Sequence, residues 1–235
     1  MKHLLLARTA LASISLAASI TPAVADDRAA FIEEMTSDYG FEQSYVASVI
    51  GNAETMQSIL DAMSRPAEKV KPWYEYREIF ITEKRINEGV EFWQLREATL
   101  EQAAAHTGVP IWMITGIVGV ETFYGRITGN YRVIDALSTL AFDYPPRSTF
   151  FRKQLQEYFL LTREEDLEIN DVKGSYAGAM GPPQFIPSSY RAYAIDGDGD
   201  GKRDLLNDWA DILYSVGNYF KENKWRTGEE VAFEA

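Results

Sequence analysis

Glu121 is the residue of this sequence whose surroundings point most clearly to chemistry. It is the only charged residue between Pro110 and Gly125, in a stretch that is otherwise mostly apolar. Burial in such surroundings raises the pKa of a carboxyl, because it disfavours the charged form. A carboxyl that keeps its proton near neutral pH can act as a general acid, for example on a glycosidic bond. The alternative is an ordinary Glu on the solvent-facing side of a core helix.

The spacing around Glu121 favours the catalytic interpretation. If a helix begins at Pro110, Glu121 shares one face with apolar residues at one-turn and two-turn intervals, namely Ile114, Ile117 and Val118. The helix is expected to end soon after Glu121, so the negative end of its dipole also raises the pKa of the carboxyl. Such a location is unfavourable for stability and suits a catalytic acid.

Other acid–base groups are scarce in this chain. It contains no cysteine and two histidines, of which His3 lies in the N-terminal signal described below. Disulfides, thiolate metal sites, cysteine nucleophiles and a zinc site with several histidines are therefore excluded. His106 stands at the end of a helical pattern, where a histidine usually complements the helix dipole. Acid–base chemistry is thus expected to come from carboxylates.

A Gly- and Pro-rich segment from Gly174 to Tyr190 carries neutral hydrogen-bonding groups. A loop of this composition can bring its backbone close to a ligand. Within it, Ser175 and Gln184 are suited to orienting a carboxyl or a sugar. The alternative is a structural turn that packs against the core.

Acidic residues crowd the segment 196–211. Carboxylates stand at positions 1, 3 and 5 of a Ca²⁺-binding loop pattern, with glycine at position 6: Asp196, Asp198, Asp200 and Gly201. Position 12 is Asn207 instead of the usual Glu, so Asp208 or Asp211 is the candidate for a late ligand. The alternative is a solvated Asp-Gly turn, but acids this dense repel one another without a cation. A structural metal ion is therefore expected.

Aromatic side chains crowd a shorter segment, Pro72-Trp-Tyr-Glu-Tyr76-Arg. Exposed aromatic rings stack on sugars, whereas buried rings fill protein cores. Both interpretations stay open for this segment.

The elements that must position these residues are expected to be helices. Apolar residues recur at helical spacing in most of the chain, and no region alternates over several strands. Short helices separated by Gly40 and Gly51 are expected between about residues 27 and 63. Further helices are expected over 84–106, from Pro110, over 131–142 and 149–162, and over 208–222. The fold class is therefore mainly α.

The first 25 residues have the features of a secretory signal. Lys2 and Arg8 precede a short apolar run from Ala10 to Ile20, and Ala23-Val-Ala25 fits a cleavage site. The alternative is an uncleaved N-terminal anchor. The mature domain is expected to span 26–235 with a net charge of −14, because the signal holds two of the basic residues of a chain at −12. An acidic chain without a basic cluster argues against nucleic acid or anionic lipid as the main partner.

Several segments occur together in an order that resembles a known family. They are Gly119–Gly125, Asp135–Pro145, Gly174–Tyr190, the Asp-rich loop and Asn218-Tyr219-Phe220. The combination resembles the membrane-bound lytic murein transglycosylase B family, glycoside hydrolase family 103, over roughly residues 27–228. The resemblance implies an α+β lysozyme-like fold that is mainly α, with a small inserted EF-hand-like metal-binding lobe.

The activity that the resemblance implies is cleavage of peptidoglycan glycan strands. The bond is the β-1,4 linkage between N-acetylmuramic acid and N-acetylglucosamine. The muramyl 6-hydroxyl attacks C1 and leaves a 1,6-anhydro ring, so no water is consumed and no cofactor serves the chemistry. A two-carboxylate hydrolase would need a partner acid, for which Asp135 and Asp143 are the local candidates.

The resemblance also implies roles for individual residues. Glu121 protonates the leaving oxygen and then takes the proton of the 6-hydroxyl, while Ser175 hydrogen-bonds to Glu121. The residues expected to line the sugar groove are Tyr76, Gln184, Phe185 and Tyr219. The residues expected to hold a structural Ca²⁺ are Asp196, Asp198, Asp200 and Asp211, with the carbonyl of Lys202.

Two departures from the family pattern shape the remaining expectations. Tethered members carry a lipid-modified cysteine that this chain lacks, so an exported, periplasmic form without a stable membrane anchor is expected in a Gram-negative bacterium. Family members also continue past the point where this chain stops, at Ala235, with a segment that adds groups to the groove. The competing hypotheses are a hydrolytic muramidase, a non-catalytic peptidoglycan-binding or cell-wall assembly protein, and a Ca²⁺-responsive structural protein.

Overall fold

The structure, a computed structural model, describes residues 22–64 and 71–231, with side chains from Asp27 onward. Helices dominate the described residues, as the sequence predicts. They are α1 (Pro22–Ser37), α2 (Gln43–Gly51), α3 (Gln57–Ser64), α4 (Trp73–Phe80), α5 (Glu83–Leu95), α6 (Glu97–Thr107), α7 (Ile111–Thr122), α8 (Val133–Phe142), the short 3-10 helix η1 (Pro145–Arg147), α9 (Ser148–Glu164), α10 (Pro187–Tyr193) and α11 (Trp209–Glu222). Two strands of two residues each, β1 (Tyr131–Arg132) and β2 (Lys173–Gly174), pair antiparallel.

One predicted helix is wrong, because residues 84–106 form two helices instead of one. The chain leaves helical geometry at Arg96, whose φ and ψ are −121° and 21°, and α6 begins at the next residue. The guanidinium of Arg96 lies 4.1 Å from the ring centroid of Trp209, at the start of α11. The apolar pattern continues across the break because Phe92 in α5 and Leu100 in α6 both enter the same core.

The described residues form two hydrophobic cores. The larger core lies among α1, α2, α3, α8 and α9 and includes Phe185. The smaller one is formed by α5, α6, α7 and α11. Neighbouring residues of α11 enter different cores, Ile212 the larger and Leu213 the smaller, so α11 fastens the two together.

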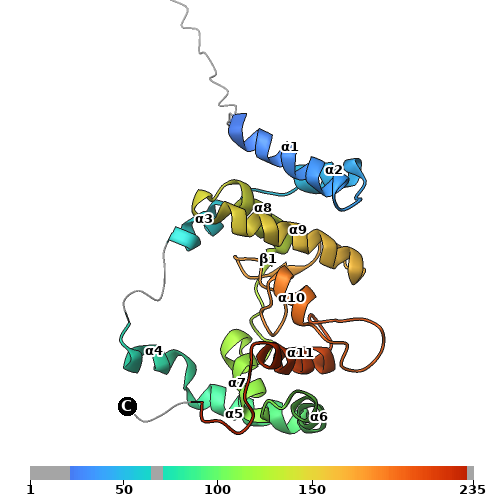
Figure 1. Cartoon of the computed structure of the whole chain (residues 1–235). Helices are drawn as coiled ribbons and strands as arrows, with labels where there is room; N and C mark the ends of the chain where they lie inside the picture. The colour runs from blue at the N-terminus through green and yellow to red at the C-terminus, as the bar shows by residue number, and fades with distance from the viewer. Residues whose placement is uncertain (1–21, 65–70, 232–235) are drawn as a thin grey trace, which may run out of the picture.

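The Gly- and Pro-rich segment runs between these two cores, where Figure 1 places β1 and α10. Its start pairs with β1, through Tyr131 and Gly174, and Met180 then forms isolated bridges with Gly174 and Phe185. Gly181 has φ +64°, and a Cβ atom there would overlap the carbonyl of Leu205. The segment is therefore a folded loop that the absence of a side chain at Gly181 allows to pack against the Asp-rich segment.

The predicted secretory signal lies outside the described residues, except for residues 22–25, which belong to the first turn of α1. Among the described residues, no single helix has both the length and the apolar composition to cross a membrane. The consecutive helices α6 and α7 reach them only together, across a bend of 112°.

Candidate active site

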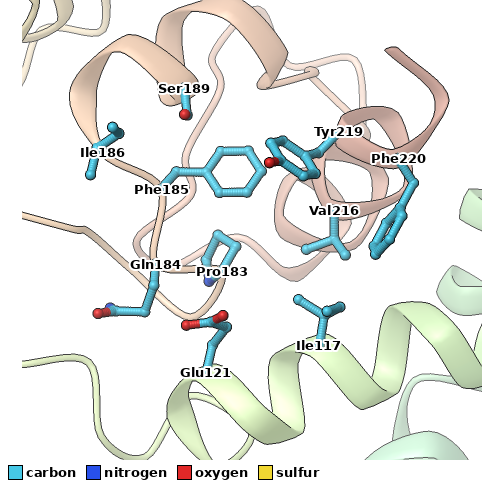
Figure 2. A pocket seen from close by; sticks show the side chains of 10 residues that line it. All are labelled: Ile117, Glu121, Pro183, Gln184, Phe185, Ile186, Ser189, Val216, Tyr219 and Phe220. Carbon is cyan, nitrogen blue, oxygen red and sulfur yellow. The ribbon is translucent and has the colours of Figure 1, made fainter. Parts of the chain in front are cut away.

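A cavity of about 310 Å³ lies between α7, α11 and the loop that precedes α10 (Figure 2). This volume falls in the range of small-ligand pockets. Its walls are largely apolar, and the lining residues are Ile117, Glu121, Pro183, Gln184, Phe185, Ile186, Ser189, Val216, Tyr219 and Phe220. Glu121 is the only carboxylate among these lining residues.

Glu121 projects from the last turn of α7 into this cavity, one turn after Ile117 (Figure 2). The helix face predicted to carry Glu121 is therefore fully buried in the core at Ile114 and Val118, and it borders the cavity at Ile117 and Glu121. Glu121 is not buried in the core, and the residue is exposed. Desolvation by the cavity walls nevertheless raises the pKa of its carboxyl. The carboxyl is accessible to a substrate and also disposed to keep its proton.

The end of α7 is held in an unusual conformation immediately after the acid. Phe123 and Tyr124 both have left-handed backbones, with φ 54° and 61°. The ring of Tyr124 lies against the backbone of Gly119, where a Cβ atom would stand 2.7 Å from it. Arg85 of α5 also donates a hydrogen bond to the Gly119 carbonyl at 2.8 Å. Left-handed conformations of non-glycine residues cost energy and persist where the surroundings hold them, so the last turn of α7 is firmly fixed.

The wall opposite Glu121 combines one amide with two aromatic rings. Gln184 has φ 52°, and its Nε2 donates to the carbonyls of Thr128 and Gly181 at 3.1 and 2.9 Å. The Gln184 side chain is thus fixed through its nitrogen, which leaves its oxygen available to accept a hydrogen bond. The rings of Phe185 and Tyr219 are 5.7 Å apart between centroids, at an interplanar angle of 52°.

The structure brings together four of the residues predicted for the catalytic and sugar-binding site: Glu121, Gln184, Phe185 and Tyr219. It does not bring Tyr76 into the lining of this cavity. Tyr76 lies in α4, where its ring packs against Phe80 at 5.3 Å between centroids. The aromatic residues of this helix are only partly covered, with Trp73 70% exposed.

The predicted hydrogen bond between Ser175 and Glu121 is absent from the described residues. The Oγ of Ser175 instead accepts the backbone N–H groups of Ala177 and Ala179, at 3.3 and 3.1 Å. These contacts hold the turn at the start of the loop and leave the hydroxyl proton available. Its role toward substrate stays a prediction.

The two candidate partner acids are engaged in structural contacts. Asp135 is 4% exposed and accepts bonds from the Arg132 guanidinium at 2.6 and 2.8 Å and from the Glu54 N–H at 2.9 Å. Asp143 accepts from Arg28 and Thr55. These contacts tie the segment around residues 54–55 and the helix α1 to α8. Neither carboxylate lines the cavity.

Sequence reasoning missed part of the lining. Val216 and Phe220 of α11 were not predicted as site residues, although Val216 lies three residues before Tyr219 and Phe220 lies four residues after Val216, which are the spacings of one helix face. That spacing is the signal that identifies them. Pro183 and Ile186 come from the irregular loop before α10, whose side-chain directions have no such periodicity, and Ser189 belongs to α10.

The Asp-rich segment forms the loop between α10 and α11. Asp196, Asp198 and Asp211 each direct one carboxylate oxygen to a common point, with these oxygens within 4.8 Å of one another. Asp208 instead caps α11, accepting N–H bonds from Ala210 and Asp211. Of the two candidate late ligands, the geometry therefore selects Asp211.

The donor set of this group fits a hard cation. Carboxylate oxygens are the ligands that Ca²⁺ prefers. Asp211 is 1% exposed, and burial is the main cause that raises the pKa of its carboxyl. Asp200 lies outside the group, and its Oδ1 accepts the N–H of Lys202 at 2.8 Å. The ligand roles predicted for Asp200 and for the Lys202 carbonyl stay predictions.

Comparison with known proteins gives consistent matches. A curated relative, the membrane-bound lytic murein transglycosylase B of Escherichia coli (strain K12), is 41% identical over 211 residues, which cover 86% of this chain. The chain spans 58% of the length of that relative. The crystal structure of the soluble lytic transglycosylase SltB1 from Pseudomonas aeruginosa matches with 54% identity and a TM-score of 0.85, covering 87% of this chain and 69% of that one.

A third match is the lytic transglycosylase Slt35 of Escherichia coli, solved in complex with calcium. It is 40% identical with a TM-score of 0.83, and the match covers 87% of this chain and 65% of that one. These likenesses confirm the predicted lysozyme-like, mainly helical fold. The family model described as the transglycosylase SLT domain matches residues 23–235. The chain therefore belongs to the family of transglycosylase SLT domain proteins.

Proposed function

We propose that this chain is a lytic transglycosylase that cleaves the β-1,4 bond between N-acetylmuramic acid and N-acetylglucosamine in peptidoglycan. The observation that carries the proposal is that, among the described residues that line the cavity, Glu121 is the sole carboxylate. Hydrolysis of a glycosidic bond by two carboxyl groups requires them to stand roughly 5–9.5 Å apart across the bond. Asp135 and Asp143 are committed to structural contacts instead. The names of the related proteins support the same reaction.

A single carboxyl is enough if the substrate supplies its own nucleophile. The protonated Glu121 donates its proton to the glycosidic oxygen as the bond from C1 to that oxygen breaks. The 6-hydroxyl oxygen of the muramyl residue then bonds to C1, and its proton passes to the carboxylate of Glu121. The acid is restored, no water is consumed, and the muramyl product carries a 1,6-anhydro ring. The raised pKa of Glu121 supports the first step, because the carboxyl must start protonated.

The remaining walls are suited to holding a glycan strand. The rings of Phe185 and Tyr219 offer apolar surface for the face of a sugar, and Tyr219 is 38% exposed. The fixed amide of Gln184 presents an acceptor for a sugar hydroxyl or acetamido N–H. We assign these residues to substrate binding.

Substitution of Glu121 by Gln tests the proposal. The variant Glu121→Gln keeps the shape of the side chain but cannot donate a carboxyl proton, so release of muropeptides from purified sacculi is expected to fall at least about 10³-fold. Binding to sacculi is expected to persist. Release that continues in Glu121→Gln contradicts the proposal, and a wild-type protein that binds sacculi without releasing muropeptides supports the non-catalytic alternative.

Asp135→Asn is the matched control for this experiment. The change leaves the Arg132 guanidinium without its charged partner, so stability is expected to fall by about 1–3 kcal/mol. The folded fraction is expected to release muropeptides at the wild-type rate, because Asp135 does not line the cavity. A folded Asp135→Asn protein without activity would restore Asp135 as a second catalytic carboxyl.

Two further assignments accompany this function. We propose that the group of Asp196, Asp198 and Asp211 holds a structural Ca²⁺, supported by the converging oxygens and by the calcium complex of Slt35. The cation would neutralise the acidic loop and fix the start of α11.

We also assign the protein to the periplasm, supported by the signal features of residues 1–25 and by a relative named as a membrane-bound murein enzyme.

A further inference from the structure

Thr122, the residue after the catalytic acid, makes a contact that the proposed mechanism does not use. It is the last residue of α7 and is 1% exposed. Its Oγ1 donates a hydrogen bond to the Pro182 carbonyl at 2.8 Å, across 60 residues of sequence. The same oxygen accepts the N–H of Gly125 at 3.0 Å. One buried hydroxyl thus fastens both the turn after α7 and a distant loop.

The loop at the other end of this hydrogen bond carries much of the cavity wall. The three residues that follow Pro182, namely Pro183, Gln184 and Phe185, all line the cavity with Glu121. Among the described residues, the Pro182 carbonyl accepts no hydrogen bond other than the one from Thr122. Thr122 follows Glu121 in sequence, and Pro182 precedes Pro183. This hydrogen bond therefore joins the helix that carries the acid to the loop that forms the facing wall.

Other contacts fasten the loop farther from the acid. Gln184 is held by the Thr128 carbonyl, and Met180 exchanges backbone hydrogen bonds with Phe185. None of these contacts involves α7. Loss of the Thr122 hydroxyl would leave the loop folded but remove its direct hydrogen bond to the helix that carries Glu121.

We infer that Thr122 is a positioning residue whose hydroxyl sets the separation between Glu121 and the wall formed by Pro183, Gln184 and Phe185. The inference rests on the proposed function, since it assigns Thr122 a role in that same site. A glycosidic oxygen must sit within hydrogen-bond reach of the acid while its sugar contacts the facing wall. A misplacement of about 1 Å between such groups can cost on the order of 10²-fold in rate.

The separation also controls how much water reaches the acid. Desolvation by the walls is what raises the pKa of Glu121. If the loop moves away from α7, Glu121 becomes better hydrated and its pKa falls toward the ordinary value. A purely structural role of Thr122 would change stability without changing that pKa, so the pKa distinguishes the two.

Three variants test the inference. Thr122→Val keeps the shape and removes the hydroxyl, whereas Thr122→Ser keeps the hydroxyl and its hydrogen bonds to the Pro182 carbonyl and the Gly125 N–H. The matched control is Thr115→Val on the same helix, because Thr115 is also buried, at 7% exposure, and its Oγ1 has no hydrogen-bond partner among the described residues. All three are measured in the full chain, by kinetics on a defined peptidoglycan oligomer and by NMR titration of the Glu121 carboxyl with labelled Glu.

Thr122→Val is expected to lose about 10- to 100-fold in kcat with KM changed by no more than about twofold. The pKa of Glu121 is expected to fall in that variant. Thr122→Ser is expected to recover most of the rate and of the pKa, and Thr115→Val to match the wild type in both.

Two results overturn the inference. One is a folded Thr122→Val protein with wild-type kcat and an unchanged Glu121 pKa. The other is a Thr122→Ser protein that loses as much rate as Thr122→Val. Failure of the proposed function is recognised separately, because a wild-type protein inactive on the oligomer contradicts the function while the titration still reports on the link between Thr122 and Glu121.

Discussion

At the scale of single residues, the central feature is a carboxyl that is exposed to substrate and partly desolvated at once. Glu121 is exposed to solvent as a residue, while desolvation by partial burial in the cavity raises the pKa of its carboxyl. Such a group destabilises the fold at neutral pH relative to a neutral side chain, because folding disfavours its charged form. The proposed acid catalysis accounts for such a group at this position, whereas stability does not.

The pH dependence of the reaction follows from the direction of this pKa shift. Glu121 must be protonated at the start of the reaction, so activity is expected at pH values below its pKa and to be lost as the pH rises through it. Because the pKa is raised, the descending limb of kcat/KM is expected above the ordinary value of a Glu carboxyl. A pH profile on a soluble peptidoglycan oligomer measures it, and a descending limb at the ordinary carboxyl value would contradict the assignment.

The pattern of residues singles out Glu121, and the family resemblance predicts Gln184, Phe185 and Tyr219 beside it, but neither predicts the contacts of Ser175. Glu121 was recognisable because a lone charge in an apolar helix stands out against a regular pattern. Ser175 lies in an irregular loop, where the partner of a hydroxyl depends on the local turn and not on spacing. In the structure, backbone N–H groups of this turn donate hydrogen bonds to the Oγ of Ser175, the hydroxyl that was expected to contact Glu121.

At the scale of elements, two glycines of α7 differ in whether their surroundings leave room for a side chain. Gly119 has no room for a side chain, because a Cβ atom would stand 2.7 Å from the Tyr124 ring. Gly116, one turn earlier on the same helix, has no atom within 4 Å of the corresponding position. The close packing of Tyr124 is one of the contacts that fix the turn after Glu121.

A matched pair of substitutions tests this packing. Gly116→Ala is expected to stabilise the protein by about 0.5–1 kcal/mol, the usual gain of Ala over Gly inside a helix. Gly119→Ala is expected to destabilise it by about 1–3 kcal/mol, because the Tyr124 ring must move. Urea denaturation of both variants measures the difference, and an equal effect of the two substitutions would show that Tyr124 does not occupy this slot.

The existence of most helices was predictable, but the break between α5 and α6 was not. The apolar period runs through Arg96 because α5 and α6 face the same core, so periodicity alone predicts one helix over 84–106. The turn at Arg96 brings its guanidinium over Phe92 and Trp209. Trp209 is more than 100 residues away in sequence, and a local pattern does not contain this contact.

At the scale of the whole molecule, the candidate site lies where two cores meet. Ile117, Val216 and Phe220 come from elements of the smaller core, whereas Phe185 belongs to the larger one. The Asp-rich loop leads into α11, which enters both cores through Ile212 and Leu213. A cation bound by that loop would therefore stabilise an element on which both cores depend.

Calcium is accordingly expected to raise the stability of the whole fold. At a free concentration of about 100 times the dissociation constant, binding contributes about 2.7 kcal/mol. Thermal unfolding with Ca²⁺ and with a chelator measures the effect. Asp198→Asn is expected to weaken the response, while Asp166→Asn, an acid next to the loop with a side chain 93% exposed, is expected to leave it unchanged. An identical melting temperature with Ca²⁺ and with chelator would remove the structural role of the ion.

The most direct test of the central claim is the chemistry of the products. Purified sacculi are digested with the wild-type protein, and the released muropeptides are identified by mass spectrometry. If Glu121 acts as a lone acid that becomes the base, the muramyl ends carry 1,6-anhydro rings and are lighter by one water than hydrolysis products. Reducing muramyl ends would show that water is the nucleophile and would contradict the proposal that Glu121 works without a second carboxyl.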